Sequence, residues 1–172
     1  MSSSAVAPSP LPPSILVERP EHARAVEVLV DRAFGPGRFA KSSERLREGN
    51  RKLDDCAFVA LLDGRVIGSV RLWPVTVGDK PVAFLGPLAV DADERSHGLG
   101  QALVEAACAA AAKAGWRAVL LVGDAPYFGR IGFSAEPAAQ ATMPGPADQR
   151  RVLVKALVEG GDQGLVGPIR VA

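Results

Sequence analysis

The chain is poor in the residue types that mark several classes of protein. Its 172 residues include two cysteines, two histidines and one tyrosine, and aromatic residues make up 5%. Cys56 and Cys108 lie far apart, without the paired spacing of a zinc site or the density of a secreted disulfide framework. We therefore expect no metal site, and two buried thiols in a reducing compartment.

An excess of one charge and long apolar runs are also missing. Twenty Lys and Arg residues face nineteen Asp and Glu residues, so a net charge of +1 creates no field that would attract nucleic acid or an anionic membrane. The longest apolar run, 106–112, is far shorter than the roughly 20 residues that cross a bilayer. Residues 1–14 lack the basic and apolar parts of a signal peptide. The sequence thus predicts a cytoplasmic protein with no nucleic-acid or membrane partner.

Length and composition fit a single domain. An apolar fraction of 48% in a chain of this length can fill one hydrophobic core. We expect residues 1–14, rich in Ser, Ala and Pro, to form a disordered tail, and residues 15–172 to form the domain.

Hydrophobic periodicity divides this domain into helices and strands. Apolar residues at three- and four-residue spacing predict a helix over 21–34, and a second, more polar and exposed helix is expected over 39–49. Asp63-Gly64 suits the two-residue turn of an antiparallel hairpin. A long helix is expected from Gly98 to Gly115, and a short one over 127–131. The expected strands cover 15–18, 56–62, 65–77, 82–90, 118–122 and 150–158, with a further short strand at 169–171.

One stretch of the sequence carries a chemical signal. An apolar strand over 84–90 is followed by the loop 95–100, Arg-Ser-His-Gly-Leu-Gly, and then by the long helix. A glycine-rich turn before a helix directs unpaired amides and the positive end of the helix dipole at one point, which is a seat for phosphate or pyrophosphate. The same glycines also suit a tight turn without a ligand, so this stretch alone leaves both interpretations open.

A known family matches this pattern. Arg95-x-x-Gly98-x-Gly100 resembles the Gln/Arg-x-x-Gly-x-Gly/Ala signature of the GCN5-related N-acetyltransferases. Residues 127–133, Tyr-Phe-Gly-Arg-Ile-Gly-Phe, are similar to the aromatic segment that follows the fifth strand in that superfamily. The resemblance covers about 15–158 and looks most like a bacterial branch whose substrates are mostly undefined. It implies an α/β acyl-CoA N-acyltransferase fold with a mixed, mostly antiparallel central sheet flanked by helices.

The resemblance also implies an activity. The chain would transfer an acetyl group from acetyl-CoA to a primary amine, of a small molecule or a peptide, by direct attack. The backbone of Leu88, Ala89 and Val90 would pair with the pantetheine arm. The Leu88 amide would polarise the thioester carbonyl, since the preceding Pro87 has no N–H. Phe128 would lie against the arm. The other expected cofactor-binding residues are Arg95, Ser96, His97, Gly98, Leu99, Gly100, Gln101 and Arg130.

The general acid is less clearly defined. A tyrosine commonly protonates the departing thiolate in this family, and its position is occupied here by Phe128. Tyr127, the only tyrosine of the chain, lies one place earlier, and one residue on a helix turns a side chain by about 100°. Tyr127 as the acid, Tyr127 as a packing residue and water as the acid therefore all remain open. Asp124 is a candidate base or amine anchor, or the N-cap of a helix.

Two other functions compete with the acetyltransferase. A non-catalytic acyl-CoA-binding module is compatible with the missing tyrosine at position 128. A nicotinamide dinucleotide site is suggested by Gly98-Leu99-Gly100 before a helix and by Asp124 after the next strand. Leu103 in place of a third glycine and the antiparallel hairpins argue against the latter. The sequence leaves the amine acceptor and homodimer formation open, and we expect the acceptor pocket to be lined by 39–50, 73–74 and 136–149.

Overall fold

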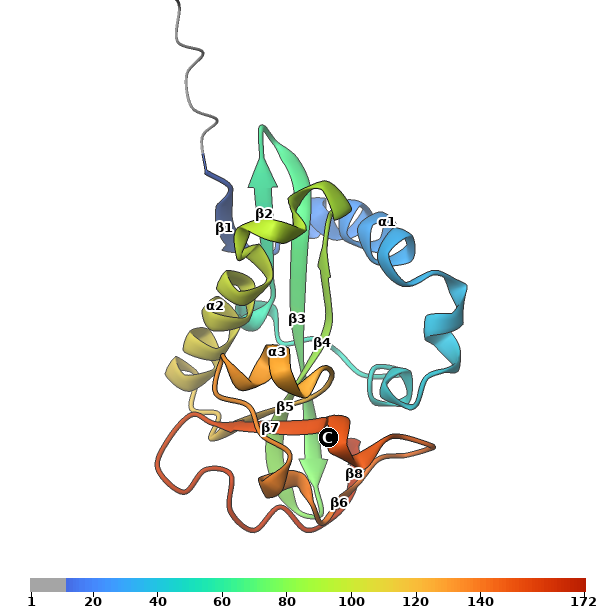
Figure 1. The fold of residues 1–172 in the computed structure, drawn as a ribbon, viewed down its shortest axis with the longest axis vertical. Helices are drawn as coiled ribbons and strands as arrows, with labels where there is room; N and C mark the ends of the chain where they lie inside the picture. Colours follow the sequence, from blue (N-terminus) through green and yellow to red (C-terminus); the bar gives the residue numbers. More distant parts are fainter. Residues whose placement is uncertain (1–11) are drawn as a thin grey trace, which may run out of the picture.

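The computed structural model describes residues 12–172, except for the side chains of Ser96 and His97. A long twisted sheet forms the centre of this part of the chain, with α1 (Ala23–Phe34) and α2 (Leu99–Lys113) packed on it and the short α3 (Ala125–Gly129) near the middle of the view (Figure 1). The strands are β1 (Ser14–Val17), β2 (Phe58–Leu62), β3 (Arg65–Val77), β4 (Lys80–Val90), β5 (Ala118–Val122), β6 (Ala141–Thr142), β7 (Val152–Ala156) and β8 (Gly167–Val171).

The strand order of the sheet is β1-β2-β3-β4-β5-β7, and β8 pairs with both β3 and β6. The pairs β4–β5 and β6–β8 are parallel, and the other pairs among the described residues are antiparallel. The predicted mixed, mostly antiparallel sheet flanked by helices is therefore confirmed. β1 begins at Ser14, one residue before the expected start of the domain.

The two long helices cover opposite faces of the sheet. α1 packs its buried residues against Val59 of β2, whereas α2 packs against Ala60, the next residue of the same strand. Successive side chains of a strand point to opposite faces, so the two helices must lie on opposite sides. Cys56 and Cys108 are both free and buried in the α2 layer, as the sequence predicts.

The hairpins follow the turn chemistry of the sequence. Asp63 and Gly64 both have positive φ, 51° and 77°, which a two-residue turn between β2 and β3 requires. Pro74 lies inside β3, where it faces Ala83 of β4. On its other side β2 pairing ends at Val70 and β8 pairing begins at Val75. Its missing N–H is therefore tolerated at a local edge of the sheet.

The predicted second helix over 39–49 is wrong. Two short 3-10 helices, Pro36–Ala40 and Ser42–Leu46, replace it, and extended backbone at Lys41 separates them. The segment is also not an exposed element, because Leu46 is fully buried in a core cluster with Val75 and Phe84. One leucine that is buried against β3 and β4 anchors a segment whose composition otherwise indicates a surface helix.

A chain of ion pairs ties this segment to the sheet. Arg71 of β3 is 9% exposed and donates two hydrogen bonds of 2.9 Å to the carboxylate of Glu18, which is 5% exposed. Arg71 also contacts Glu27 of α1 at 3.1 Å. Glu27 in turn contacts Arg38 at 3.3 Å, and Arg38 contacts Asp31 at 2.9 Å. We call these residues the Arg71 ion-pair chain.

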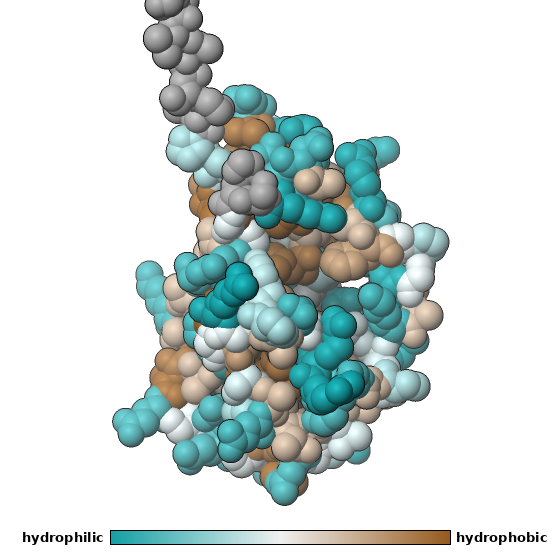
Figure 2. Space-filling model, in the orientation of Figure 1, coloured by the Kyte–Doolittle hydropathy of each residue, from teal (hydrophilic) through white to brown (hydrophobic). Residues whose placement is uncertain are grey.

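On the face drawn in Figure 2, hydrophobic residues form small groups separated by hydrophilic ones. Among the described residues, no helix combines the length and the apolar character that a membrane crossing needs.

Candidate functional site

The site begins where β4 and β5 separate. The two strands pair only at Ala83–Val119 and Phe84–Leu120, after which β4 has no partner on that side. On its other side the register slips between Val70–Leu88 and Leu72–Leu85, so Gly86 and Pro87 together oppose a single residue of β3. Such a bulge bends a strand and increases its twist. The bulge lies at the point where the two strands part.

Beyond the bulge, β4 offers free backbone groups. The amide of Asp91 donates to the carbonyl of Ile67 on β3 at 2.7 Å. Because backbone groups alternate along an antiparallel strand, Ala89 also faces β3, whereas Leu88 and Val90 direct their amide and carbonyl groups into the gap. Consistent with this geometry, Arg95 Nε donates to the Val90 carbonyl at 3.2 Å. The gap is therefore lined by the N–H groups that an extended ligand or a polarised carbonyl requires.

A second set of free amides lies at the start of α2. Gly98 has the left-handed φ of 71° before the helix, and the amide of Ala102 makes the first helical hydrogen bond, to the Gly98 carbonyl at 3.1 Å. The amides of Leu99, Gly100 and Gln101 are thus left without helical partners, as an anion seat requires. The Leu99 side chain is buried in the core, and Gln101 bonds Glu105 at 3.0 Å.

The predicted cofactor-binding arginines do not lie at these free amides of α2. The Arg95 guanidinium is engaged with Val90, as above, while Arg130 is exposed just after α3. The preceding 3-10 helix, Ala92–His97, includes the backbone of Ser96 and His97. Roles for the side chains of these two residues lie outside the described part of the structure.

Tyr127 and Phe128 point to different places. α3 begins at Ala125, two residues earlier than predicted, and Asp124 caps it by accepting from the Tyr127 amide at 3.0 Å. Phe128 lines the pocket described below. The Tyr127 hydroxyl approaches Gly100 so closely that a Cβ at position 100 would lie 2.7 Å from it and 3.8 Å from a methyl of Leu88. Burial raises the pKa of the Tyr127 phenol, so it carries its proton at neutral pH.

A pocket of about 610 Å³ opens into the gap between β4 and β5. This volume suits a small molecule or the end of a chain. Its floor is formed by β4 from Phe84 to Leu88 and by the end of β5 from Leu121 to Asp124. Two of the three segments expected to line the acceptor pocket contribute to it, through residues 40–43 with Arg47 and through 143 with 146–148, while 73–74 do not.

The two covering segments meet across the pocket. Ser42 donates its hydroxyl to the carbonyl of Pro146 at 2.5 Å, and Gly145 fits so tightly that a Cβ there would lie 2.7 Å from Ser42 Oγ. Arg47 holds the first segment to β4. Its guanidinium lies above the Phe84 ring and would be 3.0 Å from a Cβ at Gly86, while it pairs with Glu44 at 2.7 Å.

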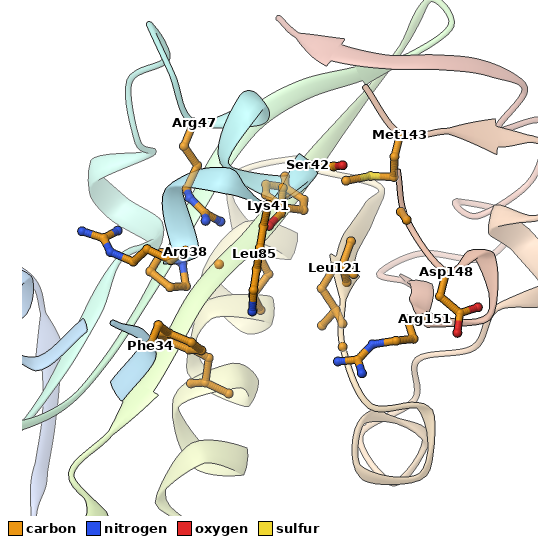
Figure 3. Close-up of a pocket in the computed structure, with 18 of the residues that line it drawn as sticks. Phe34, Arg38, Lys41, Ser42, Arg47, Leu85, Leu121, Met143, Asp148 and Arg151 are labelled. Carbon is orange, nitrogen blue, oxygen red and sulfur yellow. The ribbon is translucent and has the colours of Figure 1, made fainter. Parts of the chain in front are cut away.

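Sequence reasoning missed the basic character of this pocket. Its walls carry four basic side chains, Arg38, Lys41, Arg47 and Arg151 (Figure 3). The even charge balance of the sequence hides them, because they come from segments more than 100 residues apart. No three His, Cys, Asp or Glu side chains among the described residues lie close enough together to hold a metal ion.

Comparison with known proteins agrees with this geometry. Residues 23–133 match the Acetyltransferase (GNAT) family. The chain is 31% identical over 156 residues to the uncharacterized N-acetyltransferase YhbS of Escherichia coli strain K12, covering 89% of this chain and 92% of that protein.

Solved structures show the same relationship. The E. coli GNAT family N-acetyltransferase YhbS in complex with CoA superposes with a TM-score of 0.81 at 29% identity, covering 96% of this chain and 93% of that one. A GNAT acetyltransferase from Brucella melitensis in complex with acetyl-CoA has a TM-score of 0.60 at 25% identity, with 82% and 94% coverage. The separated strands β4 and β5 and the glycine before α2 agree with these matches, which extend over most of the chain. The chain belongs to the Acetyltransferase (GNAT) family.

Proposed function

We propose that the chain is an N-acetyltransferase that transfers an acetyl group from acetyl-CoA to a primary amine by direct attack. The observation that carries the proposal is the unpaired edge of β4, where the Leu88 and Val90 amides face a gap that opens into a pocket. The free amides at the start of α2 supply a second fitting surface, for the pyrophosphate. The CoA and acetyl-CoA complexes of the two structural relatives support this choice of cofactor.

Each part of the site has a distinct task in this reaction. Bound acetyl-CoA supplies an activated thioester, whose C–S bond breaks as the amine nitrogen bonds to the acetyl carbon. The Leu88 amide donates to the oxygen of that carbonyl, on which negative charge develops during attack. The Tyr127 hydroxyl, protonated at neutral pH, gives its proton to the departing thiolate. The attacking nitrogen loses a proton to water or to Asp124, the carboxylate that lines the pocket at the end of β5.

A non-catalytic acyl-CoA-binding module remains the second candidate. It is favoured by one observation, the apolar ring of Phe128 lining the pocket where the family commonly has a tyrosine. Membership of the GNAT family argues against the nicotinamide dinucleotide alternative.

Titration calorimetry with acetyl-CoA, CoA and NADH tests the proposal. Gly98→Asp adds a carboxylate at the anion seat, where no atom lies within 4 Å of the new Cβ, and Gly98→Asn, a neutral side chain of the same shape, controls for the strain at the left-handed φ of 71°. Ala114→Asp adds the same charge at the opposite, exposed end of α2 and is the matched control. We expect micromolar or tighter acetyl-CoA binding, about −8 kcal/mol, that Gly98→Asp weakens at least tenfold and Ala114→Asp preserves. Binding of NADH but of neither CoA species would overturn the proposal.

Turnover separates the enzyme from the binding module. Release of free CoA thiol would be followed with a panel of primary amines, including amino acids, polyamines and peptide N-termini. Thiol release that depends on the amine supports an enzyme. Tight acetyl-CoA binding without release for any amine supports the non-catalytic module.

A further inference from the structure

The walls of the pocket carry more positive than negative charge. Four basic side chains line it, against the two carboxylates of Asp124 and Asp148. Asp148 is paired with the exposed Arg150 at 3.0 Å, whereas one oxygen of Asp124 accepts from the Tyr127 amide and its charge has no cationic partner among the described residues. Asp124, at the end of β5, is therefore the one lining carboxylate among the described residues whose charge is not balanced by a cation.

Two of the four basic side chains are neutralised by their neighbours. Arg38 is bound by Asp31 and Glu27 of the Arg71 ion-pair chain, and in Figure 3 its guanidinium points away from the pocket. Arg47 is bound by Glu44, through both Nε and Nη2. These two arginines are structural, and each has a carboxylate to balance its charge.

Lys41 and Arg151 have no such partner. No carboxylate of the described residues lies within ion-pair distance of either side chain; Lys41 Nζ lies 5.9 Å from the centre of the Phe34 ring. In Figure 3 the two side chains extend from opposite walls towards the space between Leu85 and Leu121. They belong to the two covering segments that the Ser42–Pro146 hydrogen bond holds together.

Two unpaired cations in one pocket select the ligand. They repel a second ammonium group and attract an anionic group, to which both can donate charge-assisted hydrogen bonds. They also lower the pKa of an amine bound nearby, which favours the neutral form that attacks a thioester. The two cations do not serve the cofactor pyrophosphate, because its proposed seat is formed by residues 98–101 at the start of α2 and none of these residues lines this pocket.

We infer that the amine acceptor carries an anionic group, a carboxylate or a phosphate, and that Lys41 and Arg151 bind it. This inference rests on the proposed function and narrows its substrate from amines in general to zwitterionic or anionic amines. Polyamines and unmodified alkylamines are then poor acceptors.

Binding to the CoA-loaded protein tests the inference without requiring turnover. The probes are ω-amino acids with two to six carbons, their neutral carboxamides and the matching aminoalkyl phosphonates, each titrated calorimetrically. We expect at least one anionic probe to bind tenfold or more tightly than its carboxamide. Comparison of the carboxylate and phosphonate arms identifies which anion is preferred. If no anionic probe is preferred over its carboxamide, the inference is overturned.

Variants identify the residues that bind the anion. Lys41→Met and Arg151→Met should each abolish most of the preference for the anionic probe, because each removes one donor. Lys113→Met and Arg170→Met, exposed and outside the pocket, are matched controls that should keep it. Equal preference in all four variants would overturn the assignment.

A separate titration of the unmodified protein and of each variant with CoA distinguishes failure of this inference from failure of the proposed function. Normal CoA binding with no anion preference overturns only the inference. Absence of CoA binding by the unmodified protein overturns the proposed function and, with it, the inference.

Discussion

At the scale of single residues, Gly100 and Tyr127 are fitted to each other. Alanine is normally preferred to glycine in a helix by roughly 1 kcal/mol, but a methyl group at position 100 would lie 2.7 Å from the Tyr127 hydroxyl. We expect Gly100→Ala to lower the free energy of unfolding by about 1–2 kcal/mol, as overpacking does, and to weaken acetyl-CoA binding. Urea unfolding and calorimetry measure the two effects.

Gly129→Ala is the control for this substitution. Gly129 ends α3 with no atom within 4 Å of an added Cβ. Gly129→Ala should therefore leave stability unchanged or raise it by up to about 1 kcal/mol, and should leave cofactor binding unchanged. A Gly100→Ala protein as stable as the Gly129→Ala protein would show that Tyr127 moves aside without cost.

The proton for the thiolate gives a second prediction at this scale. Tyr127→Phe removes the hydroxyl and keeps the ring that packs against Phe128, with centroids 4.9 Å apart. We expect kcat to fall about a hundredfold while the acetyl-CoA dissociation constant changes little, because general-acid catalysis acts on the chemical step. Steady-state kinetics and calorimetry separate the two quantities, and an unchanged kcat would assign the proton transfer to water.

Single residues also mark the limit of what the sequence predicts about the site. The loop from Arg95 to Gly100 and the strand end at Leu88 follow from a contiguous motif, and the structure brings them together, since a Cβ at Gly100 would lie 3.8 Å from a methyl of Leu88. Lys41 and Arg151 could not be found in this way. Each looks like an ordinary surface cation until the fold brings the two segments to one pocket.

At the scale of elements, we expect the contact between the two covering segments to control the shape of the proposed acceptor pocket. Gly145→Ala would place a methyl group 2.7 Å from Ser42 Oγ and should push the segments apart. We expect the KM for the amine to rise several-fold while the acetyl-CoA dissociation constant stays constant, since the cofactor seat lies elsewhere. Steady-state kinetics at saturating acetyl-CoA measures this change.

A compensating change makes this prediction specific. Ser42→Ala removes the atom that collides but also the hydrogen bond to Pro146, so Ser42→Ala alone is the reference, and adding Gly145→Ala to it should raise the KM little further. A rise in KM on adding Gly145→Ala to Ser42→Ala that is as large as in the unmodified protein would show that the defect does not come from this contact.

Most elements could be predicted because their signals are local. The Asp63-Gly64 turn, the glycines around α2 and the β-branched runs of β3 and β5 act through neighbouring residues. The segment 36–46 could not, because one buried leucine, Leu46, and the extended backbone at Lys41 decide its course. β6 was also missed, since two residues paired with β8 leave no periodicity to detect.

At the scale of the whole molecule, the buried thiol of Cys108 makes the free energy of unfolding depend on pH in the alkaline range. Burial raises the pKa of Cys108 to about 11, whereas an unfolded thiol titrates near about 8.5. A group whose pKa is raised by folding contributes stability that is complete below its unfolded pKa and is lost as the pH rises through its folded pKa.

We therefore expect the free energy of unfolding to fall between about pH 8.5 and 11. The unmodified protein should lose about 2–3 kcal/mol more over this range than a Cys108→Ala variant, which keeps every other titrating group. Urea denaturation at several pH values measures both curves. Parallel curves would mean that Cys108 does not contribute.

The Arg71 ion-pair chain affects the order in which parts of the protein can fold during synthesis. Glu18, Glu27 and Arg38 leave the ribosome before Arg71, and β1 leaves before β2, its partner in the sheet. The nascent N-terminal third can therefore neither complete its sheet nor pair the Glu18 carboxylate, which is buried in the folded chain. Because domains tend to fold as units during synthesis, β1, α1 and the first covering segment must wait for the β2–β3 hairpin before they can dock. The wall that carries Lys41 is translated early but assembled late.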